Sequence, residues 1–314
     1  MNSIPISVVM SVYNCEKYLV SAIESVLNQT CKNFEFIIIN DGSTDNSLQI
    51  INSFKDPRIV VIDQENKGLS KALNVGIAIS RSDLIVRMDA DDICMETRIQ
   101  KQIEFMGCNP DCVACGSNAI YIDKDGRELY TSEQVIEWGK IKSLLPFSPF
   151  YHSSVIFRKS IFEKCGGYFE DIKQNFEDRV LWNLMAKYGE LRNIQAALIK
   201  YRIVPSGISN RSKKENFILN KICNNVIETG KLNEVDKILL EKTVSRSNDG
   251  SKLASYYLRI GKIYLEQNFN RIKALKNLTI SIWYNPKEKV GWFNLALCFI
   301  PRQLVKRWKK SRGV

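Results

Sequence analysis

Apolar runs of strand length alternate with amphipathic segments of helix length in the first ninety residues, and this alternation restricts the fold more than any other feature of the chain. The predicted strands cover residues 6–12, 34–40, 58–62 and 84–88, and the predicted helices cover residues 16–29, 44–54 and 69–79. Such an alternation predicts an α/β fold with a mostly parallel sheet and helices on both faces. In sheets of this kind, ligands bind beyond the carboxyl ends of the strands.

The last of these strands, at residues 84–88, is followed by three carboxylates, Asp89, Asp91 and Asp92. Carboxylates this close to an apolar strand repel one another strongly unless a positive charge lies among them. A hard divalent cation with oxygen ligands meets that need, whereas a solvated acidic loop that caps the next helix is the structural alternative. Tyr13 and Asp41 also follow predicted strands, and this shared position favours a functional site.

The remainder of the chain changes character near residue 211. Before it we predict a helix from Thr97, further strands at 112–116, 119–122 and 154–158, and a helix opened by Glu177 and Asp178. Acids in a first helical turn are often only partners of the helix dipole. After it, helical periodicity covers about 212–229, 234–244, 253–266 and 271–283. We therefore expect a catalytic domain at 1–211, a helical region at 212–300 and a basic amphipathic tail at 301–314.

The composition bounds the class of protein. The 314 residues are 45% hydrophobic, which is ample for a folded core. Nine irregularly spaced cysteines, without a signal-peptide pattern, predict free thiols in a reducing cytosol. The longest apolar stretch, about 290–301, is far shorter than the roughly 20 residues of a spanning helix, so we expect no membrane span.

The net charge of +11 is uneven, because no acid follows Glu288 while seven Lys and Arg side chains do. In the tail, apolar residues stand beside cations, which favours a helix that lies on anionic lipid. A solvated basic end without a partner is the alternative. Nucleic acid is not the expected partner, because the charge is terminal and no nucleic-acid-binding motif occurs.

Several segments together resemble glycosyltransferase family 2, whose members have the GT-A fold. They are Pro5-Ile-Ser-Val-Val-Met-Ser-Val-Tyr-Asn14, Asn40-Asp-Gly-Ser-Thr-Asp45, Asn66-Lys-Gly-Leu-Ser-Lys-Ala-Leu-Asn74, Arg87-Met-Asp-Ala-Asp-Asp92, His152-Ser-Ser-Val-Ile-Phe-Arg158, Gly166-Gly-Tyr168 and Glu177-Asp178. The resemblance covers roughly residues 4–205. It implies inverting transfer of a sugar from a nucleotide diphosphate, usually UDP, and Asn40 departs from the acid that many relatives carry there.

The resemblance also implies roles for individual residues. Ser11 and Tyr13 match positions that contact the nucleotide, and Asp41 matches the uracil contact. Asp89 and Asp91 match the Asp-x-Asp motif, in which the second acid holds Mg2+ or Mn2+, and Asp92 matches a supporting position. Asp178 matches the catalytic base, with Glu177 beside it. His152 lies at a family-typical position near the acceptor or the metal, although a lone histidine is more often structural.

These residue types suit one in-line displacement. No glycine-rich phosphate cradle occurs in the sequence, so the charge of the departing diphosphate is left to a metal ion. A single base on the acceptor side suits inversion, since retention would ask for a second, nucleophilic carboxylate. We therefore expect a metal-dependent hexosyltransferase that uses UDP-glucose or UDP-galactose. The acceptor would be a lipid-linked glycan such as GlcNAc-diphosphoundecaprenol, in O-antigen or capsule assembly on the cytoplasmic face of the inner membrane.

Three other classes of protein remain as alternatives. Cys108, Cys112 and Cys115 have the spacing of radical iron–sulfur enzymes, although cysteine in a strand often acts as a small buried hydrophobe. A nucleotidyltransferase would need a glycine-rich basic loop near residues 7–14, and none is present. A basic protein that binds nucleic acid or membrane, with an inactive transferase fold, is the non-enzymatic alternative.

Overall fold

The computed structural model describes residues 6–172, 175–205, 207, 213–245, 249–301 and 303. In this part of the chain, nine strands form one mixed sheet in the order β3-β2-β1-β4-β8-β6-β9-β5, with β7 paired to β6. The strands are β1 (Ser7–Val12), β2 (Glu35–Asp41), β3 (Ile59–Gln64), β4 (Leu84–Asp89), β5 (Ile93–Cys94), β6 (Cys112–Ile122), β7 (Glu128–Thr131), β8 (Ile156–Arg158) and β9 (Glu190–Arg202).

The first four strands form the predicted parallel half of the sheet. β1 lies between β2 and β4 and is parallel to both, and β3 extends the sheet beyond β2. The switch in strand order therefore falls at β1, so the loops after β1, β2 and β4 meet at one edge. In the register, Ser11 is opposite Asp89, and Val12 is opposite Asn40. The sequence prediction of a shared edge is confirmed.

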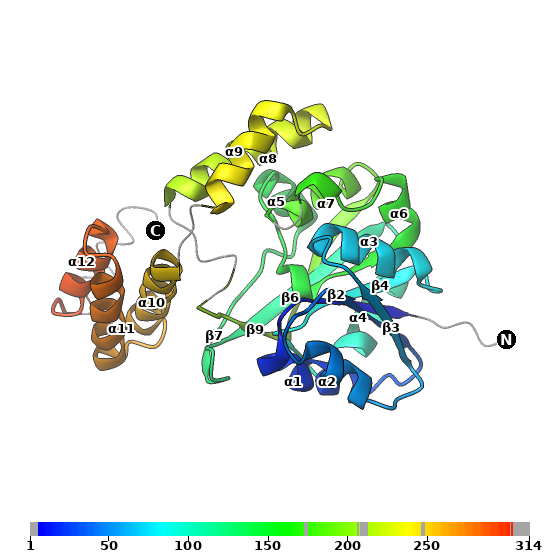
Figure 1. Ribbon diagram of the computed structural model, residues 1–314, viewed down its shortest axis with the longest axis horizontal. Helices are drawn as coiled ribbons and strands as arrows, with labels where there is room; N and C mark the ends of the chain where they lie inside the picture. The colour runs from blue at the N-terminus through cyan, green and yellow to red at the C-terminus, as the bar shows by residue number, and fades with distance from the viewer. Residues whose placement is uncertain are drawn as a thin grey trace. The chain divides into compact units, whose positions relative to one another are not determined.

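Helices cover both faces of this sheet (Figure 1). They are α1 (Glu16–Leu27), α2 (Ser47–Ser53), α3 (Leu69–Ile79), α4 (Arg98–Cys108), α5 (Trp138–Leu144), α6 (Lys159–Lys164) and α7 (Glu177–Met185). Side chains of β1 alternate between two hydrophobic clusters, with Val8 and Met10 packed among residues of α1, α2 and α4, and Val9 among residues of α3, α6 and α7. Period-two alternation with both faces buried explains the nearly continuous apolar sequence of β1.

The second half of the sheet is where the sequence prediction was least complete. β8 lies within the strand predicted at 154–158 and runs antiparallel to both β4 and β6. The separate strands predicted at 112–116 and 119–122 are one strand, β6. The longest strand, β9, was not predicted. It pairs with the two-residue β5 directly after the aspartates, so it holds the end of the Asp89–Asp92 segment.

The C-terminal part is helical, as expected, with α8 (Lys213–Thr229), α9 (Glu234–Ser245), α10 (Asp249–Glu266), α11 (Arg271–Tyr284) and the unpredicted α12 (Lys289–Leu297). The chain forms two compact units. One comprises residues 1–121, 131–202 and 219–236, and the other comprises 122–130, 203–218 and 237–314. The boundary expected at residue 211 stays a prediction. The basic tail lies outside the described residues, apart from 301 and 303. No described helix has the length and apolarity that a membrane span requires.

Candidate active site at the ends of β1, β2 and β4

The loop after β1 and the loop after β2 are joined by reciprocal hydrogen bonds. Asn14, at a positive φ of 48°, accepts from the Thr44 amide at 2.8 Å, and its own amide donates to the Ser43 hydroxyl at 3.1 Å. The amide of Glu16 donates to Asp45, and a Glu16 carboxylate oxygen accepts from the Asn46 amide in return. α2 begins at Ser47, so the helix predicted at 44–54 starts three residues later than expected.

The hydrogen bonds between these two loops leave Tyr13 at the surface, where it is 52% exposed. Ser11 is partly buried on β1, opposite Asp89. An exposed aromatic ring beside the mouth of a site suits stacking on a flat ring of a ligand, whereas an isolated exposed tyrosine is ordinary at a protein surface. The nucleotide contacts of both residues remain predictions.

Asp41 organises the neighbouring loop. Its carboxylate is buried and accepts from the Gln64 amide nitrogen at 2.7 Å and from the backbone amides of Lys67 and Gly68 at 2.9 Å each. Gly42 allows this close approach, because a Cβ there would lie 2.5 Å from the Asn66 backbone nitrogen and its φ is +71°. Asp41 therefore fixes the loop before α3, and its expected contact with uracil remains a prediction.

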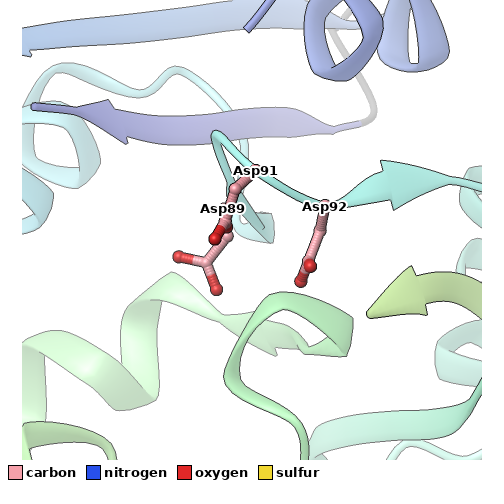
Figure 2. Close-up of side chains that lie close together, drawn as sticks. All are labelled: Asp89, Asp91 and Asp92. Carbon is pink, nitrogen blue, oxygen red and sulfur yellow. The ribbon is translucent and has the colours of Figure 1, made fainter. Parts of the chain in front are cut away.

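The three carboxylates after β4 form the one cluster of potential metal ligands that the described residues contain, with ligand atoms within 4.8 Å of one another (Figure 2). Burial and the charge of Asp89 raise the pKa of Asp91 to about 7. Burial, followed by the charges of Asp91 and Asp89, raises the pKa of Asp92 well above its usual value. The cluster thus carries more negative charge than its surroundings balance, and a divalent cation would relieve this repulsion.

The three aspartates have different partners. One oxygen of Asp92 accepts from the Arg202 amide at 2.7 Å, and the other accepts from the Ser153 hydroxyl. Asp89 forms an ion pair with Arg87. No other described residue donates a hydrogen bond to the Asp91 carboxylate, while the Arg202 guanidinium donates to the Asp91 backbone carbonyl at 2.7 Å. Asp91 therefore has the carboxylate best placed to accept a metal ion, and Asp92 suits a supporting position.

Arg87 is a site residue to which the sequence analysis assigned no role. Its side chain is almost fully buried, its Nη1 pairs with Asp89, and its Nε has no hydrogen-bond partner among the described residues. The charge of the same guanidinium offsets part of the rise in the pKa values of Asp91, Glu177 and Asp178. One buried cation is thus shared by the metal-ligand candidates and the candidate base. The sequence signal was a single charge inside an apolar strand, since such a charge must be paired.

Glu177 and Asp178 begin α7, as predicted. Glu177 is buried, and burial and the charge of Asp178 raise its pKa to about 7. Asp178 is partly exposed, and burial raises its pKa while a hydrogen bond from Ser148 lowers it. A raised pKa suits a general base, although helix-dipole partners also occupy this position.

His152 bridges two buried groups next to this helix. Its Nε2 lies 2.7 Å from the Tyr168 hydroxyl, and its Nδ1 lies 3.6 Å from a Glu177 oxygen. Burial, followed by the charge of Arg87, lowers the pKa of His152 well below its usual value, so the ring is neutral at pH 7. Asn74 holds Tyr168 in place by two hydrogen bonds with its backbone, each 2.9 Å long. His152 is therefore a hydrogen-bonded residue that lines the candidate site.

Of the three cysteines of the iron–sulfur alternative, only Cys112 and Cys115 are side-chain neighbours. Cys112 and Cys115 are buried in a hydrophobic cluster, whereas Cys108 is exposed, and the three form no described metal-ligand cluster. All nine cysteines lie in the described part of the chain and are free thiols, as predicted.

Comparison with solved structures identifies the fold. The chain superposes on TarS from S. aureus, crystallised in complex with UDP, with a TM-score of 0.56 at 18% identity, covering 91% of this chain and 93% of that one. The fold is thus that of a GT-A glycosyltransferase, as predicted.

Sequence comparison identifies the family. The model of "Glycosyl transferase family 2" matches residues 7–166. The amylovoran biosynthesis glycosyltransferase AmsE of Erwinia amylovora is 30% identical, over 69% of this chain and 82% of that protein. The UDP-Glc:alpha-D-GlcNAc-diphosphoundecaprenol beta-1,3-glucosyltransferase WfaP of Escherichia coli is 31% identical, over 67% and 82%. The chain belongs to glycosyltransferase family 2 and is a glycosyltransferase.

Proposed function

We propose that this protein moves a hexose, with inversion, from a UDP-sugar to a hydroxyl of a lipid-linked glycan during bacterial polysaccharide assembly. The observation that carries the proposal is the placement of the Asp89, Asp91 and Asp92 carboxylates and the Glu177–Asp178 pair around one buried cation, Arg87. Two acidic groups with separate partners suit two tasks, namely holding the leaving diphosphate and accepting a proton.

The substrates are inferred from relatives. TarS has been crystallised with UDP and with UDP-GlcNAc, which supports a UDP-sugar donor. The name of WfaP specifies UDP-glucose and a GlcNAc-diphosphoundecaprenol acceptor, and AmsE and the O-antigen glycosyltransferase WbnJ of Escherichia coli also serve polysaccharide synthesis. We propose UDP-glucose or UDP-galactose as donor and a diphosphoundecaprenol-linked sugar as acceptor. An acceptor of that kind would place the protein at the cytoplasmic face of the inner membrane.

The proposed chemistry assigns one task to each group. Asp91 would hold Mg2+ or Mn2+, with Asp89 beside it, while Asp92 keeps the loop in place. The metal supplies positive charge to the diphosphate as it leaves. Asp178 accepts the proton of the acceptor hydroxyl as that oxygen bonds to the anomeric carbon and the bond to the diphosphate breaks. Ser11 and Tyr13 would contact the nucleotide, and Asp41 would contact the uracil.

Calorimetric titration with UDP, GDP, CMP and dTDP, with and without Mn2+, tests the nucleotide site. We expect UDP to bind more tightly when Mn2+ is present, and Asp91→Asn to abolish this enhancement without lowering the melting temperature, since relief of repulsion favours the amide. Asp125→Asn, at an exposed acid away from the cluster, is the matched control. A folded protein that binds no nucleotide under any condition would contradict the proposal.

The base is tested separately by turnover. Asp178→Asn should retain metal-dependent UDP binding and lower kcat by about 10²–10⁴-fold, the usual contribution of a general base. An unchanged kcat would show that Asp178 serves only as a partner of the helix dipole at the start of α7.

A further inference from the structure

Large apolar side chains lie on the outer surface of α11 and α12, where no described element covers them. Ile272 is 83% exposed, Trp283 is 76% exposed and Phe299 is 73% exposed, and Trp292 is also more than half exposed. Both helices belong to the same compact unit and pack side by side (Figure 1). We name these four residues, three aromatic side chains together with Ile272, the aromatic face. Exposed apolar groups gathered on one unit mark an interaction site more often than scattered ones do.

The spacing of these residues shows that they share sides of their helices. Ile272, Thr279 and Trp283 are separated by seven and four residues, which places them on one stripe of α11. The buried residues of α11, Ala274, Leu278 and Ile282, lie on another side and pack in the unit. Trp292 and Phe299 are likewise seven residues apart, the latter in the turns that continue α12.

α12 is apolar on all sides. No charged residue occurs from Val290 to Pro301. The buried side of α12 consists of Gly291, Asn294 and Leu297, so its other, exposed sides also lack charge. A helix that is apolar all round is normally covered on all sides, by protein or by lipid. The missing periodicity is the reason why the sequence analysis did not predict this helix.

The net charge of this part of the chain indicates which partner suits the exposed apolar side chains. Residues 267–314 contain eleven Lys and Arg residues and one acid, Glu288, so they carry +10 of the net +11 of the chain. Lys276 lies on the same side of α11 as Ile272 and Trp283, and Lys287 and Lys289 immediately precede α12. The described residues 267–301 hold five Lys and Arg residues and one acid, so pairing of this face with a second copy would bring two net charges of +4 together, which is unfavourable. An anionic lipid surface offers both negative headgroups and an apolar layer.

We propose that the aromatic face binds the surface of an anionic membrane, with its aromatic side chains inserted at headgroup depth and the surrounding lysines on the phosphates. This extends the membrane contact expected for the tail at 301–314 to the folded helices α11 and α12. The proposal does not depend on the identity of the donor or the acceptor, because it concerns a surface of a different unit from the nucleotide site.

Vesicle sedimentation of the full chain tests the proposal. Wild type should bind vesicles of phosphatidylcholine with phosphatidylglycerol, and only weakly vesicles of phosphatidylcholine alone. The double variant Trp283→Ser/Phe299→Ser should bind anionic vesicles at least about tenfold more weakly, because each aromatic side chain contributes apolar burial. Phe217→Ser is the matched control, since Phe217 on α8 is also 73% exposed, and it should bind as wild type does.

Two further measurements separate the alternatives. Melting temperature and metal-dependent UDP binding should be unchanged in the double variant, which shows that the loss is local. Equal binding of wild type and double variant, with loss only on deletion of residues 302–314, would overturn the proposal in favour of the tail. Sedimentation equilibrium that shows a wild-type dimer dissociated by the double variant, without vesicle binding, would overturn it in favour of a second copy.

Discussion

At the scale of single residues, the site depends on how few cations balance many carboxylates. Arg87 lies within electrostatic reach of Asp89, Asp91, Glu177 and Asp178, and its burial keeps water from screening these charges. The sequence identified the acids, because carboxylates after apolar strands are conspicuous. It could not identify Arg87 as their shared partner, because Glu177 and Asp178 come from a distant part of the chain.

Replacement of Arg87 should therefore be costly. Arg87→Met removes one partner of a buried ion pair, which typically lowers the free energy of unfolding by about 3–5 kcal/mol. Mn2+ should restore more stability to this variant than to wild type, because it supplies positive charge to the same carboxylates. Urea unfolding with and without Mn2+ measures both effects. Arg127→Met, at an exposed ion pair, should change stability by less than about 1 kcal/mol, and an equal loss in both variants would refute the role of Arg87.

The raised pKa of Glu177 predicts that the free energy of unfolding depends on pH. Because its folded pKa of about 7 exceeds its usual value of 4.5, the folded state binds more protons than the unfolded state between these pH values. The free energy of unfolding should thus fall as pH rises from about 4.5 to 7, by up to about 3 kcal/mol from this group. Glu177→Gln should flatten this slope in metal-free urea titrations at pH 5 and pH 7. An identical slope in wild type and variant would show that Glu177 ionises normally.

At the scale of elements, local pattern and burial decided which strands and helices could be predicted. β1, β2, β4 and α3 were located from sequence because both faces of each of these strands are buried and the helix has one apolar side. β3 was also located, although its residues are partly or fully exposed. β9 was not predicted because its buried and partly buried positions alternate only at its start, where one of the buried positions holds the polar residue Asn193. Its pairing with β6 and β5, rather than its own composition, makes it a strand.

The contact of α10 with α11 makes a prediction for one glycine. A Cβ on Gly261 would lie 2.7 Å from Leu278 Cγ and 3.2 Å from the Leu278 backbone nitrogen, so the helices would have to separate. Gly261→Ala should lower the free energy of unfolding by about 1–3 kcal/mol, as overpacked sites do. Gly107→Ala on α4 has open space and should raise it by roughly 0.5–1 kcal/mol. Thermal unfolding of both variants checks the pair, and stabilisation by both would contradict close packing at Gly261.

At the scale of the whole molecule, the compact units do not follow the order of the chain. Residues 219–236, which include most of α8, group with the catalytic unit. Asn220 accepts from the Arg179 guanidinium at 2.7 Å, and Cys223 lies where the charges of Arg179, Asp178 and Glu177 affect its pKa. α8 thus lies beside the helix that carries the candidate base, which a reading of periodicity alone could not show.

This grouping makes truncation informative. A chain that ends at residue 236 should retain the melting temperature of the catalytic unit and metal-dependent UDP binding. A chain that ends at residue 211, the boundary expected from sequence, should melt at lower temperature, because it lacks the buried residues Leu219, Ile222, Cys223 and Val226. Scanning calorimetry compares the two chains. Equal melting temperatures would restore the boundary at 211.

The reciprocal bonding of the loops after β1 and β2 has a consequence for exchanging segments among relatives. Asn14 and Glu16 depend on partners at 43–46, about thirty residues away in the sequence. A crossover between those positions would take the loop after β1 from one parent and the loop after β2 from another. Each loop would then lack the hydrogen-bond partners with which it evolved. Recombinant libraries aimed at new donor sugars should therefore inherit residues 13–47 from one parent. Their crossovers belong after α2, where the helix leaves this joint.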